Sequence, residues 1–303
     1  MRLVVLDVAE ACAGVRTLRL GRPGGGPLPA HPPGGHVVVV AGDRRNAYSL
    51  TGDGGPADHY EISVLRKDAG SAWMHRLEPG DPVEVSAPRS RFAPVAGARR
   101  HLLVAGGIGV TPMLSHARAA VRWDRPFLLL YGYRPGHAAH LPELRELCGD
   151  RLLEYPGGRE DFAAALTAAL RCQPLGTHVY VCGPGSLIGF VLEQAAEAGW
   201  PPERVHVERF AAEEAGPGVP FDVRLRSGRR VPVPSGVSLL EALERAGITL
   251  PSMCRQGVCG ECRTGLLAGR ALHRDLYLTA EERSTAIMPC VSRADADGLE
   301  LDL

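Results

Sequence analysis

Four cysteines near the C-terminus restrict the fold of this chain more than any other feature. Cys254, Cys259 and Cys262 follow a C-x4-C-x2-C spacing in PSMCRQGVCGECRTG, and Cys290 comes after 27 further residues. Three thiolates in one loop, with a fourth from a distant segment, form the ligand arrangement of a plant-type 2Fe–2S cluster. The pattern therefore predicts a domain folded around a one-electron carrier.

Zinc and disulfides are the alternatives for these cysteines. Structural zinc usually takes two close pairs of thiolates, whereas the fourth cysteine here stands alone. Disulfide frameworks belong mainly to small secreted domains, which a chain of 303 residues without a secretory signal does not resemble. Gly257 and Gly260 favour the cluster, because they let backbone N–H groups approach the inorganic sulfurs. Cys12, Cys148 and Cys172 are interpreted as small hydrophobic residues.

Composition predicts a cytoplasmic enzyme of two or three domains. The 34 basic and 34 acidic residues cancel, so no net charge draws the chain to nucleic acid or to an anionic membrane. No apolar run reaches the roughly 18–20 residues that a membrane span needs, and the N-terminus lacks the layout of a signal peptide. We therefore expect neither nucleic acid nor membrane among its partners.

Residues 1–97 predict an antiparallel β-barrel. Short apolar segments such as LVVLDV, HVVVV and YEISVLR alternate with turn clusters such as GRPGGGPLPAHPPGG. One helix is expected in GSAWMHRLEPGD, with Ser71 as its N-cap and with Pro79 and Gly80 closing it.

Residues 98–212 alternate strand and helix patterns, which predicts an open parallel sheet with helices on both faces. HLLVAGG has the continuous apolar character of a strand buried on both faces. Residues 213–219 are expected to be a linker. A hairpin, a helix, the cysteine loop and a final strand then form a compact domain over residues 220–303.

The motif AGGIGVTP, residues 105–112, predicts a nucleotide site. It lies between a buried strand and a helix, where parallel strands receive nucleotides. Gly106, Gly107 and Gly109 keep the turn free of side chains, so that Thr111 and the helix start, with Pro112 in its first turn, can meet a pyrophosphate. A second strand end, VYVCGPG, brings three residues to the same crevice: Cys182, Gly183 and Pro184. Glycine is also what any tight strand-to-helix turn needs, so the pattern alone is weak.

NAYSLTG, residues 46–52, is a candidate site for a planar cofactor. Tyr48 and Ser49 end a predicted barrel strand and offer a ring and a hydroxyl. The basic pair Arg66 and Lys67 precedes a helix start that is a candidate phosphate cradle at Gly70 and Ser71. The alternative is that Tyr48 and Ser49 simply fill a half-buried strand surface.

Taken in this order, the motifs resemble those of the phthalate dioxygenase reductase family, which includes vanillate demethylase reductases. The resemblance spans nearly the whole chain. It is most specific at YSL, GSAWMH, VAGGIGVTPML, VYVCGPGSL and the tail HRDLYLTAEERSTAIMPCVSRADADGLELDL. It implies an FMN-binding barrel, a ferredoxin-reductase-like nucleotide domain and a C-terminal β-grasp domain with a 2Fe–2S cluster.

The resemblance also implies roles for individual residues. The family's flavin motif is R-x-Y-S, but Asn46 stands in the arginine's place and Arg45 one step earlier. Ser49 and Phe210 are expected at the hydride-transfer centre, although Phe210 equally suits a core position, and Glu208 is a weaker candidate for orienting the nicotinamide. The remaining expected flavin contacts are Ala47, Tyr48, Arg66, Gly70 and Ser71.

The activity implied is a relay. A nicotinamide gives a hydride to the flavin, and single electrons pass to the cluster and on to an external oxygenase. That oxygenase is expected to be a Rieske non-haem iron enzyme or a haem-thiolate monooxygenase, served by a monomeric reductase that docks through Arg255, Gln256, Glu261 and Arg263. The alternative, an electron-transfer subunit of a larger dehydrogenase, fits the cysteine spacing less well.

The choice between NADH and NADPH rests on the residues after FLLLYGY. A carboxylate there binds the ribose 2′-hydroxyl and repels a 2′-phosphate, whereas an arginine favours the phosphate. Arg134 follows directly, and no acidic residue comes before Glu143. The resemblance favours NADH, and Arg134 favours tolerance of NADPH.

Overall fold

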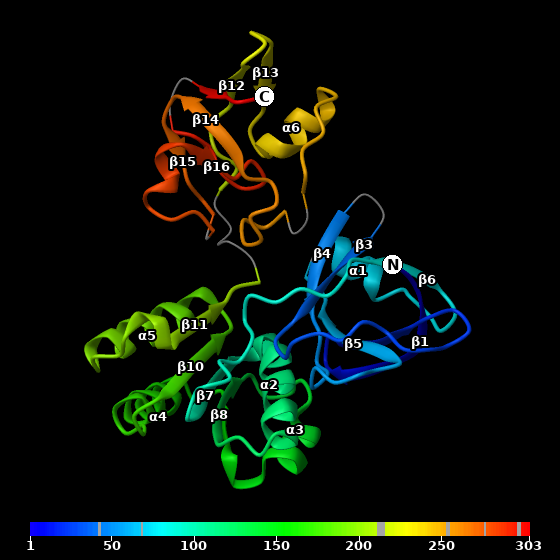
Figure 1. The fold of residues 1–303 in the computed structure, drawn as a ribbon, viewed down its shortest axis with the longest axis vertical. Coiled ribbons are helices and arrows are strands. Elements are labelled where there is room, and N and C mark those ends of the chain that lie inside the picture. The colour runs from blue at the N-terminus through cyan, green and yellow to red at the C-terminus, as the bar shows by residue number, and fades with distance from the viewer. Residues whose placement is uncertain (42–43, 68, 211–215, 253–254, 276, 296–297) are drawn as a thin grey trace. The chain divides into compact units, whose positions relative to one another are not determined.

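The computed structural model describes residues 1–303 except 42–43, 68, 211–215, 253–254, 276 and 296–297 (Figure 1). The chain divides into two compact units, Met1–Arg209 and Phe210–Leu303. The first unit contains an antiparallel and a parallel sheet, and the second contains a small mixed sheet, so the predicted fold class is confirmed. Among the described residues, no helix is long and apolar enough to cross a membrane.

The antiparallel sheet is the barrel predicted for the N-terminal block. Its strand order is β4-β3-β6-β1-β2-β5, and a bridge between Leu50 and Ile62 joins its two ends. In β6, Val83 and Val85 are buried between exposed neighbours, as expected of a strand with one face in the core. The elements of this lobe are β1 (Arg2–Cys12), β2 (Val15–Gly21), β3 (His36–Ala41), β4 (Arg44–Ser49), β5 (His59–Leu65), α1 (Ala69–Met74) and β6 (Pro82–Val85).

The prediction that Ser71 caps this helix is wrong. The helix α1 begins two residues earlier, at Ala69, and ends at Met74, five residues before Pro79. Ser71 lies inside it, where its hydroxyl accepts a hydrogen bond from the backbone N–H of Lys67 at 2.8 Å. The side chain therefore ties down the incoming loop instead of the first helical turn.

The parallel sheet has the order β11-β10-β7-β8-β9. Phe162, Leu166 and Ile188 belong to a core that packs α4 and α5 against the sheet, while α2 and α3 lie on the opposite face (Figure 1). The elements are β7 (Arg100–Gly106), η1 (Gly107–Gly109), α2 (Val110–Arg122), β8 (Phe127–Tyr133), α3 (Leu141–Cys148), η2 (Gly149–Arg151), β9 (Leu152–Pro156), α4 (Arg159–Arg171), β10 (Thr177–Cys182), α5 (Gly185–Glu197), η3 (Pro202–Arg204) and β11 (Val205–Glu208).

Helix α2 joins the parallel sheet to the barrel. The Ser115 hydroxyl accepts from the backbone N–H of Gly34 at 3.0 Å and donates to the carbonyl of Gly52. His116, which is fully buried, bonds through Nε2 to the carbonyl of Phe92 at 2.8 Å. One face of α2 thus satisfies backbone groups of the barrel loops.

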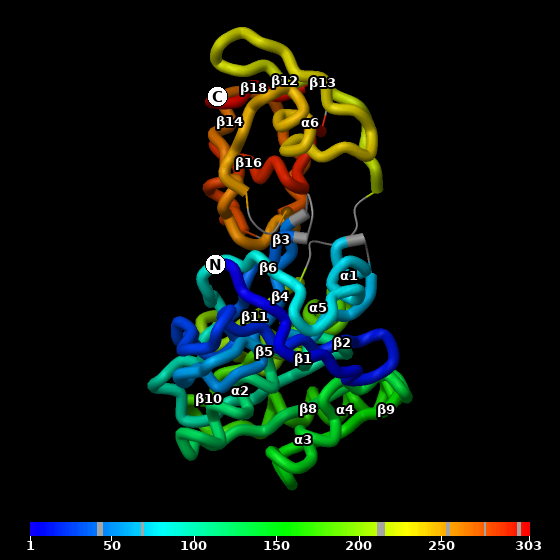
Figure 2. Tube along the Cα trace, turned by 90° about the vertical axis from the view of Figure 1, so that its right-hand side faces the viewer, coloured from blue at the N-terminus to red at the C-terminus, as the bar shows by residue number. Residues whose placement is uncertain are grey.

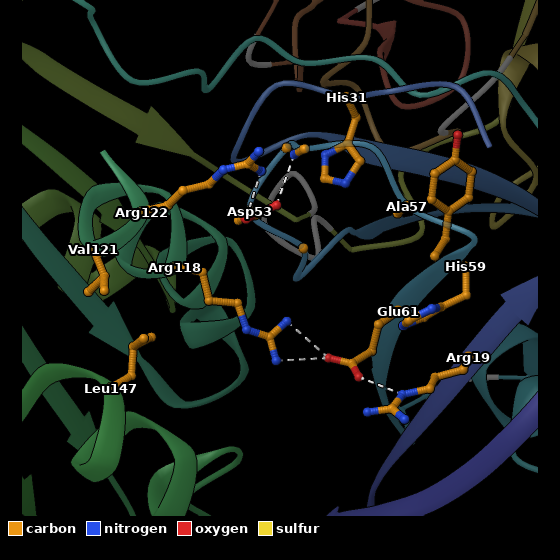
Figure 3. Close-up of a pocket in the computed structure, with 14 residues that line it drawn as sticks. Arg19, His31, Asp53, Ala57, His59, Glu61, Arg118, Val121, Arg122 and Leu147 are labelled. Carbon is orange, nitrogen blue, oxygen red and sulfur yellow. Dashed lines mark hydrogen bonds and ion pairs between the residues drawn. The ribbon is translucent and has the colours of Figure 1, made fainter. Parts of the chain in front are cut away.

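An ionic network completes this seam (Figure 3). Glu61, on β5, accepts from Thr51 Oγ1 at 2.6 Å, from Arg118 Nη1 at 3.2 Å and from Arg19 Nε at 3.1 Å. Burial alone would raise the pKa of Glu61, but the Thr51 bond and the two guanidinium groups lower it to about 2. Arg118 also pairs with Glu143, so one guanidinium links the barrel to α3. A cavity of about 480 Å³ adjoins the network, with His31, Asp53 and Arg122 on its far wall.

The second unit has the predicted β-grasp arrangement around the cysteine segments. Its main sheet has the order β13-β12-β18-β14-β16, and the Ser238 hydroxyl caps α6 by accepting from the Glu241 N–H. Helix α6 packs beside β13 (Figure 2). The elements are β12 (Phe221–Leu225), β13 (Arg230–Val233), α6 (Leu239–Arg245), β14 (Thr264–Ala268), β15 (Ala271–Leu272), η4 (Glu282–Ser284), β16 (Ala286–Ile287), β17 (Arg293–Ala294) and β18 (Leu299–Leu301).

Two arginines attach the segment 216–219 to the second unit. Arg274 Nη1 donates to the carbonyl of Gly216 at 3.1 Å, and Arg293 Nη2 donates to that of Val219 at 3.1 Å. The Arg293 guanidinium also lies 5.0 Å from the ring centroid of Phe221. The last four residues of the predicted linker are therefore packed onto the ferredoxin-like unit, and residues 213–215 lie outside the described part.

Replacing Arg118 by Met tests the importance of the seam network. We expect Arg118→Met to lower the free energy of unfolding by on the order of 2 kcal/mol, because Glu61 loses its main cation but keeps Arg19 and Thr51. Urea unfolding followed by circular dichroism measures this. Arg145→Met is the matched control, since Arg145 pairs with Glu154 on the surface of the same unit, and it should leave the midpoint nearly unchanged. Equal midpoints for both variants would contradict a structural role for the seam.

Candidate functional site

Three parallel strands end side by side at the carboxyl edge of the sheet. Cys182, the last residue of β10, lies in register with Ala105 on β7 and with Glu208 on β11. Since ligands of open α/β sheets bind outside the carboxyl ends of the strands, this edge is the candidate site.

The glycine turns predicted to bind a nucleotide pack directly against each other. A Cβ atom on Gly109 would lie 2.3 Å from the carbonyl oxygen of Cys182, and one on Gly106 would lie 2.7 Å from the side chain of Leu187. A Cβ atom on Gly183 would lie 3.1 Å from the Cα atom of Gly106. The two loops therefore approach as closely as backbones can, which explains why glycine stands at these positions.

The outer edge of the same turn is open. A Cβ atom on Gly107 would meet nothing within 4 Å, and this residue has a φ of +55°. The Thr111 hydroxyl donates to the carbonyl of Ile108 at 3.1 Å, which holds the turn at the start of α2, and Pro112 is buried in the first helical turn. A backbone edge free of side chains at a helix start suits a pyrophosphate.

Ser49 and Glu208 meet at this site, one from each lobe. Ser49 ends β4 of the barrel and is buried, and its hydroxyl bonds to the Glu208 carboxyl. Burial raises the pKa of Glu208 to about 8, although the Ser49 bond acts in the opposite direction. Glu208 Oε2 is buried and has no hydrogen-bond partner in the structure. An unsatisfied, protonated carboxyl at the strand ends is a group prepared to bond a ligand.

Cys182 lies in the same place but is not a reactive thiol. It is fully buried, and burial raises its pKa well above the usual value, with the Glu208 charge adding to the effect. The side chain therefore contributes a small, neutral wall.

The other predicted flavin residues lie on β4, on α1 and in the segment between β5 and α1. Asn46 Nδ2 donates to the Tyr48 hydroxyl at 3.4 Å, and α1, which carries Gly70 and Ser71, packs beside β4. Tyr48 and Ala47 are half-buried, and the remaining predicted cations are exposed: Arg45, Arg66 and, after β8, Arg134. Phe210 is half-buried and belongs to the second unit.

Of the four predicted cluster ligands, Cys254 lies outside the described residues. Cys262 and Cys290 are buried, and Cys259 is half-buried. The hydrogen bond with the Cys290 side chain lowers the pKa of the Cys262 thiol, against the effect of burial. In the part of the chain that the structure describes, no three His, Cys, Asp or Glu side chains converge closely enough to hold a metal ion.

The loop around these cysteines nevertheless fits a cluster. Gly257 and Gly260 have φ values of +73° and +80°, in the left-handed region that favours glycine. A Cβ atom on Gly260 would lie 2.1 Å from the Tyr277 ring, so the ring rests on the backbone between Cys259 and Cys262. Adjacent thiols, of which Cys262 has a lowered pKa, and glycines that bring N–H groups close are the chemistry that iron and sulfide require.

Sequence reasoning missed two features of the site. It did not identify the ion pair between Glu61 of the barrel and Arg118 of α2. It named Glu208 only as a weaker candidate for orienting the nicotinamide. No local pattern marks these residues. The position of Glu208 at the end of a strand parallel to the glycine turn was the available signal.

Comparisons with known proteins cover the whole chain. Residues 223–295 match the family model of the 2Fe-2S iron-sulfur cluster binding domain, and residues 85–205 match that of the dimethylamine monooxygenase subunit DmmA-like N-terminal domain. The beta subunit of the heme-dependent oxidative N-demethylase of Ectopseudomonas mendocina is 45% identical, over 91% of this chain and 90% of that one. The phthalate dioxygenase reductase of Burkholderia cepacia is 37% identical, over 100% of this chain and 97% of that one.

Two solved structures also match over the whole chain. The structure of a phthalate dioxygenase reductase, described as modular for electron transfer from pyridine nucleotides to [2Fe-2S], superposes with a TM-score of 0.85 at 36% identity, covering 100% of this chain and 98% of that one. An intact type IV self-sufficient cytochrome P450 monooxygenase gives a TM-score of 0.77 at 33% identity, covering 100% of this chain and 41% of that one.

A flavin barrel, a nucleotide-binding sheet and a ferredoxin module define an electron-transfer reductase. The chain belongs to the phthalate dioxygenase reductase family. As a member, it is an NAD(P)H-dependent oxidoreductase that passes electrons through FMN and a 2Fe–2S cluster to an oxygenase partner.

Adding a methyl group at Gly109 tests the contact between the two loops. We expect Gly109→Ala to weaken nucleotide binding at least about tenfold, because the Cβ atom forces the turn away from the Cys182 carbonyl. Fluorescence titration with NADH and NADPH measures the affinity. Gly189→Ala, on α5 with open space around its Cβ position, is the control and should bind normally. Normal affinity in both variants would show that the close contact is irrelevant.

The raised pKa of Glu208 predicts how the free energy of unfolding depends on pH. Between its ordinary pKa of 4.5 and its folded value of about 8, the folded chain holds a proton that the unfolded chain releases. The contribution of Glu208 to the free energy of unfolding therefore falls as pH rises through this window, by up to about 1.4 kcal/mol per pH unit. Denaturation at several pH values should show this slope in the wild type and a shallower one in Glu208→Gln. Identical slopes would mean that Glu208 titrates normally.

Proposed function

We propose that Ser49, Cys182 and Glu208 form the hydride-transfer centre, and we keep Phe210 as a candidate because it follows β11 by two residues in the sequence. The observation that carries this is the hydrogen bond between Ser49 of the barrel and the buried carboxyl of Glu208 at the strand ends. At neutral pH Glu208 keeps its proton, so it can donate to the carboxamide of a nicotinamide without placing a negative charge at the site. Cys182 limits how deeply the ring enters.

We further propose which residues bind the cofactors. Bound FMN takes a hydride and gives up single electrons. Asn46, Tyr48 and Ser49 provide a ring and neutral hydrogen-bonding groups against its ring system, together with the backbone at Ala47. The phosphate is expected near Gly70 and Ser71 in the first turn of α1 and near the exposed cations Arg45 and Arg66.

The pyridine nucleotide is proposed to lie along the glycine edge. Its pyrophosphate meets the open edge of the turn at Gly107 and the start of α2 at Thr111 and Pro112, beside the packed residues Gly106, Gly183 and Pro184. Arg134 is exposed at the end of β8, where it can accept a 2′-phosphate. We expect NADH as the main donor and NADPH as a tolerated one.

The cluster is proposed to bind through Cys254, Cys259, Cys262 and Cys290. The domains are proposed to span residues 1–97 for flavin, 98–212 for the nucleotide and 220–303 for the cluster, with a linker at 213–219. The match of residues 223–295 to the cluster-binding family model supports the bounds of the cluster domain. We propose a monomer, which size-exclusion chromatography with light scattering will test.

For the acceptor, we propose the haem subunit of an oxidative N-demethylase that acts on an alkylamine. The relative at 45% identity is named as the beta subunit of such an enzyme, and residues 85–205 match a dimethylamine monooxygenase subunit model. The alternative acceptor is the Rieske oxygenase of an aromatic demethylase, which the vanillate O-demethylase oxidoreductase of Pseudomonas sp. supports at 38% identity over 100% of this chain and 98% of that one.

An anaerobic titration followed by reconstitution tests the proposal. NADH should bleach both the flavin bands and the broad absorption of the cluster, and NADPH should do so at higher concentration. The reduced chain, mixed with the haem subunit and dimethylamine in air, should then yield formaldehyde. Formaldehyde from vanillate with a Rieske oxygenase, and none from the amine, would assign the chain to the aromatic systems. A protein without flavin or cluster bands would overturn the reductase proposal.

Replacing one proposed ligand separates the two halves of the relay. In Cys259→Ser we expect flavin reduction by NADH to continue, while reduction of the haem partner falls at least about a hundredfold, because the cluster loses a thiolate. Stopped-flow absorbance measures both steps. Cys172→Ser, at an exposed cysteine in the first unit, should behave as wild type. Undiminished partner reduction in Cys259→Ser would exclude this cysteine as a ligand.

A further inference from the structure

Asp275, in the second unit, is a buried carboxylate that none of the roles above uses. Asp275 as a whole is only 2% exposed. Oδ2 accepts from the backbone N–H groups of Tyr277 at 3.2 Å and Leu278 at 2.8 Å, and Oδ1 accepts from the Ser292 hydroxyl at 3.1 Å. Burying a carboxylate costs free energy unless hydrogen bonds compensate for the lost water. The donors around Asp275 therefore indicate which parts of the chain the carboxylate holds together.

These bonds lead to the segment that carries Cys290. Ser292 follows Cys290 by two residues and is itself fully buried. Its hydroxyl donates to Asp275 and accepts from the backbone N–H of Arg274 at 3.1 Å. The segment after Cys290 is therefore hydrogen-bonded, through Ser292, to both Arg274 and Asp275.

The same carboxylate controls the loop that carries the other cysteines. Through its bond to the backbone of Tyr277 it sets the position of that ring, which rests on Gly260 between Cys259 and Cys262. Its own main chain lies against Gly257, where an added Cβ atom would be 3.1 Å from the Asp275 Cα atom. Asp275 thus contacts the cysteine loop directly and through Tyr277.

Neutral donors, not a cation, supply these bonds. Nδ1 of His273 lies 3.5 Å from Oδ1, while its Nε2 bonds to the carbonyl of Arg283 at 3.0 Å. The Arg283 guanidinium donates to the backbone carbonyl of Asp275, at 3.2 Å, and not to its carboxylate. Removing the carboxylate therefore leaves two buried N–H groups and one hydroxyl without their acceptor.

We propose that Asp275 is the positioning residue of the cluster cradle. It holds the Cys259–Cys262 turn, through Gly257 and Tyr277, and the Cys290 segment, through Ser292, in one arrangement before and after the cluster is bound. It acts through hydrogen bonds and touches no reacting atom. This inference rests on the proposed cysteine ligands.

Two substitutions separate hydrogen bonding from charge. Asp275→Asn removes the charge but keeps an acceptor for the two N–H groups, and its amide can donate to the Ser292 hydroxyl. Asp275→Ala removes charge and acceptors together. Asp295→Asn is the control, since Asp295 pairs with Arg270 at the surface of the same unit. The full chain is purified with its cluster, and iron and sulfide content, the rate of cluster loss to a chelator and the electron paramagnetic resonance line shape are measured.

We expect Asp275→Ala to lose its cluster at least about fivefold faster than wild type. The loss of even one hydrogen bond raises the population of the locally open conformation that releases the cluster by about this factor. Its line shape should broaden, while Asp275→Asn and Asp295→Asn stay near wild type. Should Asp275→Ala fail to fold, Ser292→Ala, which breaks only the link to the Cys290 segment, should show the faster loss.

Either of two results overturns the inference. Wild-type retention and line shape in Asp275→Ala and in Ser292→Ala would show that the bonds do not position the ligands. Equal impairment in Asp275→Asn and Asp275→Ala would show that charge, not hydrogen bonding, is what matters. A wild-type chain that binds no cluster would instead overturn the proposed ligands, which keeps the two failures distinct.

Discussion

The pairing of Glu61 with Arg118 is the interaction on which the geometry of the first unit depends. Glu61 belongs to the barrel and Arg118 to α2, the helix that begins at the glycine turn. Because α2 is a rigid rod, holding its far half against the barrel also fixes its start, and with it Gly107 and Thr111. Ser115 and His116 reinforce this by bonding barrel backbone. The glycine turn is therefore positioned relative to the barrel by contacts that α2 makes further along its length.

This arrangement explains how the proposed hydride-transfer centre can be divided between two lobes. Ser49 and Glu208 lie on different sheets, and their hydrogen bond forms only if both lobes keep their relative position. Burial raises the pKa of the Glu208 carboxyl.

The parts that could be predicted from sequence are those that local chemistry determines. The cysteine spacing, the apolar strand before AGGIGVTP and the alternation of strands and helices each follow from neighbours in the chain, and the fold class they predicted is confirmed. Ser71 shows the limit: a serine before an apolar turn suggested a cap, but its hydroxyl bonds backward to Lys67. Glu61 and Arg118 could not be predicted, because they lie far apart in sequence and meet only through packing. Asp275 bonds the nearby backbone of Tyr277 and Leu278, but its bond to Ser292 also forms only in the folded chain. A buried acid has no local signature that distinguishes it from a solvated one.

The attachment of residues 216–219 to the ferredoxin-like unit has a consequence for module exchange. Arg274 and Arg293 bond the carbonyl groups of Gly216 and Val219, so these residues are part of the module although they precede its first strand. A chimera joined at residue 220 would leave both guanidinium groups facing a foreign backbone. One joined before Gly216 would transplant the module with its own anchorage, so the natural unit of recombination begins upstream of the sheet.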